Sequence, residues 1–265
     1  MSNDSIGKTV FVAGVLCLVC SVIVAGSAVL LKPIQTENRL LDKQKNILAA
    51  AGLLNERESV KTAFEKIETR LVNVSEGRFA TPEELSEMGV TDANLYDPRK
   101  AAKITGSNVM LSSEQDIASI KMRAKYYPVY LYRDSTGNLD KIILPVHGYG
   151  LWSTLYGFVA LKNDFNTVVG LGFYEHAETP GLGGEVDNPK WKALWPGKKI
   201  YDDQNNVSIA LVKGNVDKSS PEAVHQVDAL SGASLTSRGV TNLMQFWLGK
   251  EGFGPFLNKL GKEGV

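Results

Sequence analysis

The sequence has few cysteines, few histidines and no excess of charge of either sign. Its 265 residues include two cysteines, Cys17 and Cys20, and both lie in one uncharged stretch near the N-terminus. A disulfide framework is therefore excluded for the rest of the chain, which must be stabilised by its own hydrophobic core. Lys and Arg together number 29, as do Asp and Glu. This balance provides no overall field that would attract nucleic acid, and we predict no nucleic-acid partner.

The three histidines, His147, His176 and His225, exclude further classes of chemistry. His176 and His225 show no metal-ligand spacing with each other or with a carboxylate pair, so we predict no metal in the soluble part. The stretch "GASLT" around Ser234 approaches the G-x-S-x-G pattern of serine hydrolases, but that chain order requires a histidine after the serine, and none follows. Hydrolase chemistry is therefore disfavoured, and because no acid/base constellation is visible in the chain, we predict no catalytic residue.

One long uncharged run is present. Thr9 to Leu31, between Lys8 and Lys32, contains no charged residue. At about 1.5 Å per residue, such a helix spans the roughly 30 Å hydrocarbon core of a bilayer. The apolar region of a cleaved signal peptide is shorter, typically about 7 to 15 residues. We therefore predict a tail over residues 1–8 and a retained single-span anchor over residues 9–31.

The orientation of this anchor stays open from charge alone. Basic residues are sparse before the span and denser after it (Lys32, Arg39, Lys43, Lys45), which by the positive-inside rule favours a cytoplasmic soluble part. Long domains, however, are often translocated regardless of such counts.

Cys17 and Cys20, at i and i+3, share one face of the anchor helix. They are compatible with metal or cluster ligation between helices or with packing in the membrane, and we favour packing.

Residues 32–123 are predicted to form membrane-proximal helices and loops. Apolar residues at roughly helical spacing predict a first helix that ends at Gly52. A second helix is predicted over residues 58–72, because Val60, Phe64, Ile67 and Leu71 form one stripe. Residues 74–121 are rich in turn-forming residues and are predicted to be mostly loops with short helical pieces.

The pattern changes at Ala124. Residues 127–132, 141–146, 151–161 and 168–176 are β-branched and aromatic runs separated by turn residues. They predict an antiparallel meander in an α+β domain, with one sheet from about 124 to 215. A helix is predicted over residues 238–249, with four apolar residues on one face, Val240, Leu243, Met244 and Trp247.

Four hydroxyl side chains precede this helix in the stretch "DALSGASLTSRG", residues 228–239: Ser231, Ser234, Thr236 and Ser237. A helix N-terminus favours a phosphate, and Gly232 and Ala233 would allow its close approach to the backbone. The Walker pattern is missing, so nucleotide hydrolysis is not supported. Helix capping by Thr236 or Ser237 would explain part of the cluster.

At these residues the sequence resembles the flavinylation motif D-x-x-[ST]-G-A-T-x-[ST], whose Thr after Gly-Ala carries FMN through a phosphoester. The chain as a whole resembles the NqrC family, the flavin-carrying subunits of the Na⁺-translocating NADH:quinone reductase. That resemblance runs from the N-terminal span through "LLDKQKNIL", "ILPVHGYGLWS", "ETPGLGGE" and "GFGPFL". It implies that residues 124–265 form an FMN-binding domain in which a separate flavin-transferring enzyme attaches the cofactor.

One departure falls on the acceptor, because Ser234 stands where the family has Thr. A serine hydroxyl can form the same ester, so we expect covalent FMN on Ser234, with Thr236 as the alternative. The resemblance implies that Asp228 and Ser231 belong to the signal read by the transferring enzyme. Thr236 and Ser237 are expected to serve as cap and phosphate shell, beside Gly232 and Ala233.

The flavin ring needs a slot, and residues 175–185, "EHAETPGLGGE", are a candidate wall. Glu178 and Thr179 are expected to hydrogen-bond the polar edge of the ring, with Trp152 and Leu182 against its faces. Lys213 and Arg238 could neutralise the phosphate. Without the resemblance, an ordinary surface turn, a core tryptophan and solvated basic residues explain these positions equally well or better.

The resemblance implies an electron carrier in a bacterial inner-membrane complex that oxidises NADH, reduces ubiquinone and exports Na⁺, with other subunits as partners. It also implies a periplasmic flavin domain, against the charge count. Two alternatives stay open: the flavin subunit of the related complex that couples ferredoxin and NAD, and a membrane-tethered module that binds an anion without catalysis.

Overall fold

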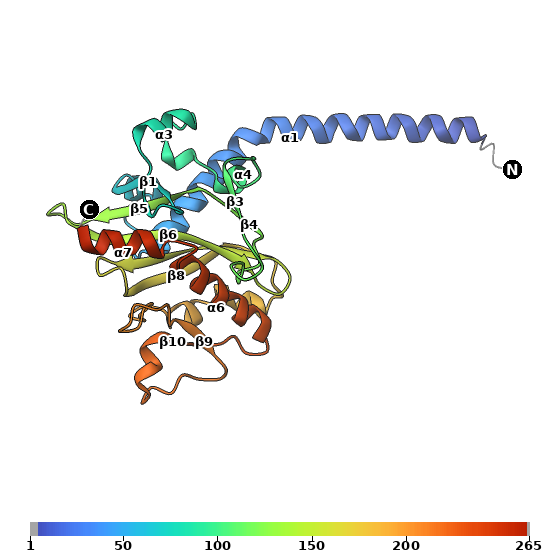
Figure 1. The fold of residues 1–265 in the computed structure, drawn as a ribbon. Coiled ribbons are helices and arrows are strands. Elements are labelled where there is room, and N and C mark those ends of the chain that lie inside the picture. Colours follow the sequence, from blue (N-terminus) through green and yellow to red (C-terminus); the bar gives the residue numbers. More distant parts are fainter. Residues whose placement is uncertain (1–4, 264–265) are drawn as a thin grey trace. The chain divides into compact units, whose positions relative to one another are not determined.

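The computed structural model describes residues 5–263 (Figure 1). Its first element is α1 (Ile6–Ala50), one α-helix that includes Pro33. The predicted span and the predicted membrane-proximal helix are therefore parts of a single helix. The chain divides into two compact units, residues 1–43 and residues 44–265, and each is described by itself.

Within the described residues, the first unit consists of Ser5 and of α1 as far as Lys43, and its uncharged stretch runs from Thr9 to Leu31. Among those residues α1 is the one helix long and apolar enough to cross a membrane. Its large apolar side chains, such as Phe11 and Val24, are exposed, as contact with lipid requires. Cys17 and Cys20 are free thiols on this exposed helix.

The C-terminal end of α1 belongs to the second unit and is buried there. Ile47 and Leu48 pack against the sheet residues Tyr130 and Phe158. The helix ends as predicted, because Gly52 has a φ of 65°, a left-handed conformation that stops a helix at low cost.

The helix predicted over residues 58–72 is wrong beyond its first turns. The structure has a short helix, α2 (Val60–Phe64), followed by strand β1 (Ile67–Asn73). Ile67 and Leu71 are four residues apart, a spacing that places two side chains on one face of a helix and also on one face of a strand. Pairing with β5 along its whole length decides in favour of the strand.

The main sheet has six antiparallel strands in the order β2-β1-β5-β6-β7-β8. Besides β1, its strands are β2 (Arg78–Phe79), β5 (Tyr126–Arg133), β6 (Leu139–Tyr149), β7 (Thr154–Lys162) and β8 (Val168–Glu175). The predicted meander is confirmed as β5 to β8. The predicted extent of the sheet is wrong at both ends, since it includes residues 67–79 and ends at Glu175.

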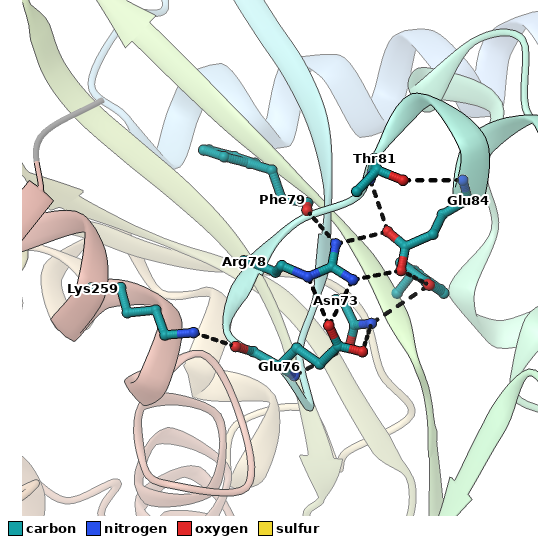
Figure 2. Close-up of polar contacts among 8 residues, drawn as sticks. Asn73, Glu76, Arg78, Phe79, Thr81, Glu84 and Lys259 are labelled. Atoms are coloured by element: carbon teal, nitrogen blue, oxygen red, sulfur yellow. Dashed lines mark hydrogen bonds and ion pairs between the residues drawn. The ribbon is translucent and has the colours of Figure 1, made fainter.

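Residues 80–124 contain short elements, as predicted: α3 (Pro82–Glu87), η1 (Ala93–Leu95), α4 (Pro98–Ala101), and the paired strands β3 (Asn108–Met110) and β4 (Met122–Ala124). Figure 2 shows how Arg78 ties β2 to α3. Its guanidinium binds both carboxylate oxygens of Glu84, at 2.7 and 2.8 Å, and one of Glu76, at 2.7 Å. Glu84 also completes a capping box with Thr81.

This ion pair shifts the pKa of Glu84. The hydrogen bonds from Arg78 and from the Thr81 backbone lower the pKa of Glu84 from 4.5 to about 2. The last helix, α7 (Gly254–Glu263), is attached at the same place, where Lys259 Nζ donates to the Glu76 carbonyl at 2.7 Å (Figure 2).

Helix α6 (Ser234–Leu248) packs on β6 and on β9 (Ala210–Val212) and covers one face of the sheet. Its predicted stripe is confirmed, since Val240, Leu243, Met244 and Trp247 are all fully buried. The remaining elements are η2 (Gly183–Asp187), α5 (Pro189–Lys192), η3 (Pro221–His225) and β10 (Gln226–Asp228). β9 and β10 form a separate parallel pair, in which Asp228 lies beside Val212.

Candidate functional site

The candidate site lies at the N-terminus of α6. The helix begins at Ser234, and the residue before it, Ala233, makes no side-chain cap. Gly232 has a φ of 72°, which favours glycine, and a Cβ there would lie 3.0 Å from Leu182 Cδ2. Ser234 is exposed. The first turn thus presents a free hydroxyl and uncapped N–H groups, the arrangement that binds a phosphate.

The two following hydroxyls point the other way. Thr236 is 0% exposed, and its Oγ1 donates to Glu178 Oε2 at 2.8 Å. Ser237 Oγ donates to the Ala233 carbonyl and accepts from the Leu230 N–H, both at 3.0 Å. The expectation that these residues cap the helix is wrong, because they occupy its third and fourth positions, where side chains face the core.

Glu178 is the centre of this arrangement. Its side chain is 4% exposed, and Oε1 accepts the N–H groups of Leu151, Trp152 and Ser153 at 3.0 to 3.1 Å. The Ser153 hydroxyl adds a longer contact at 3.4 Å. Because Oε2 accepts the Thr236 hydroxyl, both carboxylate oxygens of Glu178 are hydrogen-bonded to donors of the protein. This arrangement differs from the expected contact between Glu178 and the polar edge of a flavin.

The surroundings of Glu178 keep its carboxylate ionised at neutral pH. Burial alone would raise the pKa of Glu178, but the hydrogen bonds from Thr236, Trp152, Ser153 and Leu151 outweigh burial and lower it. The negative charge is compensated by N–H and O–H donors.

Two glycines make the close packing possible. A Cβ at Gly150 would lie 2.6 Å from Glu178 Oε1. A Cβ at Gly183 would lie 2.6 Å from Thr236 Oγ1 and 2.7 Å from Glu178 Oε2. Real Cβ atoms do not approach oxygen so closely. The segment after β6, the residue 178–185 loop and α6 can therefore pack this closely only because glycine, which has no side chain, occupies positions 150 and 183.

The loop after β8 is held by its own contacts. His176 Nε2 lies 2.8 Å from Asp187 Oδ2, and His176 Nδ1 accepts the Glu178 N–H at 3.2 Å. The Thr179 carbonyl accepts the N–H groups of Leu182 and Gly184, while the side chain of Thr179 is exposed. These internal hydrogen bonds hold the loop in one conformation, so it provides a wall of the candidate site.

Exposed apolar side chains surround Ser234. Trp152 is 65% exposed, Leu182 44% and Leu235 51%. Trp152 is held to α6 through Glu178, and Leu182 lies against Gly232, so both flank the first turn of the helix. Trp152 is not a core residue. Apolar surface beside a phosphate-type site fits a flavin, whose ring is apolar and whose phosphate is anionic.

Of the other predicted residues, Asp228 ends β10 and Lys213 follows β9, whereas Arg238 lies on α6. Asp228 Oδ1 accepts the Val216 N–H at 2.7 Å and so holds the turn that contains Lys213. The Ala229 N–H donates to the Val212 carbonyl at 2.9 Å, which brings the exposed Lys213 next to the strand leading to Ser231. Arg238 and Ser231 are exposed. Among the described residues, no group of three or more potential metal ligands is present.

Sequence reasoning missed Gly150, Ser153, Gly183 and Leu235. Leu235 had a detectable signal, since it is a large apolar residue outside the buried stripe of α6. The two glycines and Ser153 had none, because their function depends on partners far away in the sequence.

The chain is similar to known proteins over most of its length. The model of the FMN-binding domain family matches residues 150–249, which include all three segments that meet at Glu178. The NqrC subunit of the Na⁺-translocating NADH-quinone reductase from Pseudomonas aeruginosa is 54% identical over 266 residues, covering 98% of each chain. The same subunit from Yersinia pestis is 49% identical, covering 100% of this chain and 96% of its own.

Two solved structures are similar. The crystal structure of Shewanella oneidensis NqrC is 36% identical with a TM-score of 0.76, covering 85% of this chain and 100% of that one. The structure of the Parabacteroides distasonis NqrC subunit is 29% identical with a TM-score of 0.64, covering 86% and 96%. With its apolar N-terminal helix, its α+β fold and its FMN-binding domain, the chain belongs to the NqrC family of the Na⁺-translocating NADH-quinone reductase.

Proposed function

We propose that this chain carries FMN as a phosphoester on Ser234 and relays electrons between other subunits of its complex. The observation that supports this most is the contrast within the hydroxyl cluster. Ser234 is exposed at an uncapped helix N-terminus, whereas Thr236 and Ser237 are buried with their hydroxyls engaged. A flavin on Thr236 would require opening the first turn of α6.

Attachment needs an activated donor. Direct condensation of a hydroxyl with free FMN would release a water molecule, and in aqueous solution the abundant water opposes this reaction. The Ser234 Oγ–P bond would form as the phosphoanhydride bond of a flavin dinucleotide breaks, with the hydroxyl proton and a nucleoside monophosphate leaving. A flavin-transferring enzyme would catalyse this step, and Asp228 and Ser231 would be part of what it recognises. The product gains the mass of FMN less one water.

The residues present suit a cofactor that does its own chemistry. When bound, FMN supplies one- and two-electron transfer. The N–H groups of the first turn of α6 would hold its phosphate, with Lys213 and Arg238 as nearby cations. Trp152, Leu182 and Leu235 would contact its ring, and Thr179 lies on the same loop. These side chains would position a flavin, and they include no acid/base pair, which supports an electron carrier.

The exposed apolar part of α1 supports anchoring in the bacterial inner membrane. We propose that the FMN domain is periplasmic and that electrons pass from NADH toward ubiquinone with Na⁺ export by the whole complex. Protease added to intact spheroplasts tests the orientation: it should digest the domain without lysis. Protection until lysis would place the domain in the cytoplasm.

Denaturing mass spectrometry tests the covalent bond. The full chain is produced together with the flavin-transferring enzyme, and the peptide that contains Ser234 is sequenced. We expect one FMN adduct on Ser234 that survives denaturation and is lost in Ser234→Ala. An unmodified mass, with FMN released by denaturation, would show that binding is noncovalent; an adduct retained in Ser234→Ala would reassign the acceptor.

A further inference from the structure

The pair Glu178 and Thr236 links the residue 151–153 turn, the loop after β8 and α6, and both side chains are buried. We propose that these two residues form a clamp, the Glu178–Thr236 clamp, that positions Ser234 for flavin attachment and keeps it beside the walls that contact the ring. The inference rests on the proposed function of Ser234, and it assigns Glu178 and Thr236 as positioning residues that do not touch the flavin.

The clamp joins three segments that are distant in the sequence. Glu178 belongs to the loop after β8, and its Oε1 accepts three N–H groups from the residue 151–153 turn. Its Oε2 accepts the hydroxyl of Thr236, which is 58 residues away on α6. A single carboxylate therefore fixes the position of Trp152, of the loop that carries Leu182, and of the acceptor helix relative to one another.

The clamp also sets which way Ser234 points. Successive residues of an α-helix are rotated by about 100°, so residues two apart point in directions about 200° apart. When Thr236 faces the core to reach Glu178, Ser234 must face outward, and the structure shows this arrangement. The last hydroxyl of the motif, together with the buried stripe of α6, thus holds the first turn in the rotation that presents the acceptor.

The chemistry of the pair explains why a hydroxyl is needed. Ionised Glu178 only accepts hydrogen bonds, so its partner must donate. Thr236 is fully buried, and water cannot replace its hydroxyl at Oε2 without a rearrangement. Valine has nearly the same shape but no donor, whereas serine keeps the donor and loses only a methyl group.

The test compares Thr236→Val, Thr236→Ser and a matched control, Thr241→Val. Thr241 lies on the same helix, and its hydroxyl accepts the Leu211 N–H at 2.9 Å and donates to the Ser237 carbonyl at 3.2 Å. The control therefore also removes a bonded hydroxyl from α6, but it leaves the clamp intact. Full-length chains in detergent are incubated with the flavin-transferring enzyme and FAD, and the initial rate of adduct formation on Ser234 is normalised to the folded fraction.

We expect Thr236→Val to attach flavin at least about tenfold more slowly than wild type, because small misplacements of a reacting group are costly. Thr236→Ser should stay within about threefold, and Thr241→Val within about twofold, of the wild-type rate. The visible circular dichroism of the attached flavin should change in Thr236→Val and not in Thr241→Val, a difference that loss of stability alone would not produce.

Equal normalised rates and equal flavin dichroism for Thr236→Val and Thr241→Val would overturn the clamp, as would a Thr236→Ser rate no better than that of Thr236→Val. Both outcomes presuppose a wild-type adduct on Ser234. If wild type gains no adduct there, the proposed function fails and the clamp fails with it, so the two failures are distinguishable.

Discussion

Gly183 lies where the loop after β8 meets α6, and its replacement by alanine gives a quantitative prediction. A Cβ at this position would lie 2.6 Å from Thr236 Oγ1, 2.7 Å from Glu178 Oε2 and 3.0 Å from Glu178 Cβ. The φ of Gly183 is outside the left-handed region, so the added methyl group causes steric overlap without backbone strain.

The size of the effect follows from two opposing contributions. Overpacking a close-packed site costs about 1–3 kcal/mol. Replacing Gly by Ala restricts the unfolded chain and returns about 0.4–1 kcal/mol where the backbone is compatible. We therefore expect Gly183→Ala to lower the free energy of unfolding by about 0–2.6 kcal/mol relative to wild type. Relative to a Gly→Ala change that causes no overlap, we expect a loss of about 1–3 kcal/mol, or of about 2–12 °C in Tm.

Urea unfolding of the full chain in detergent, followed by tryptophan fluorescence, measures this difference. Gly172→Ala is the matched control, because a Cβ there meets no atom within 4 Å and the glycine has no left-handed φ. The control should be as stable as wild type or slightly more stable. If Gly183→Ala matches the control, the close approach of loop and helix is refuted, together with the argument for the clamp geometry.

Three further predictions concern other parts of the second unit. The folded pKa of Glu84, about 2, lies below its ordinary 4.5, so the stabilisation it provides is present above pH 4.5 and lost as pH falls toward 2. Glu84→Gln should therefore reduce the urea midpoint more at pH 6 than at pH 3; equal reductions would contradict the ionic role of the Arg78 contact. Leu243→Ala should cost about 2–5 kcal/mol in urea unfolding, because Leu243 is fully buried, and a cost under about 1 kcal/mol would mean that α6 packs differently. Trp152→Ala should change the free energy of unfolding by less than about 0.5 kcal/mol, since the side chain is 65% exposed, while altering flavin fluorescence. Unchanged fluorescence would exclude Trp152 from the ring contact.

Several elements were predictable because local periodicity decides them. The four runs that became β5 to β8 alternate or are continuously apolar between turn residues, and the stripe on α6 repeats at helical spacing. The apolar span of α1 is set by length and composition alone. In each case the pattern lies within one segment, so neighbouring residues contain the necessary information.

Strand β1 was not predictable in this way. The four-residue spacing of Ile67 and Leu71 fits both a helix and a strand, and local sequence does not separate the two. The choice is made by β5, whose residues 126–132 pair with residues 67–73. The contact that decides the conformation lies about 60 residues away, beyond any local window.

The hydroxyl cluster at residues 231–237 was also predictable from local sequence only in part. The sequence by itself predicted a helix after these residues and a flavinylation-type motif with Ser where the family has Thr, but α6 begins earlier than predicted, at Ser234. It left Ser234 and Thr236 as alternative acceptors and placed Glu178 at the flavin. Only the tertiary structure decided that Thr236 is buried on Glu178 while Ser234 is exposed, because the Thr236 hydroxyl binds a carboxylate 58 residues away in the chain and glycines allow the two segments to meet.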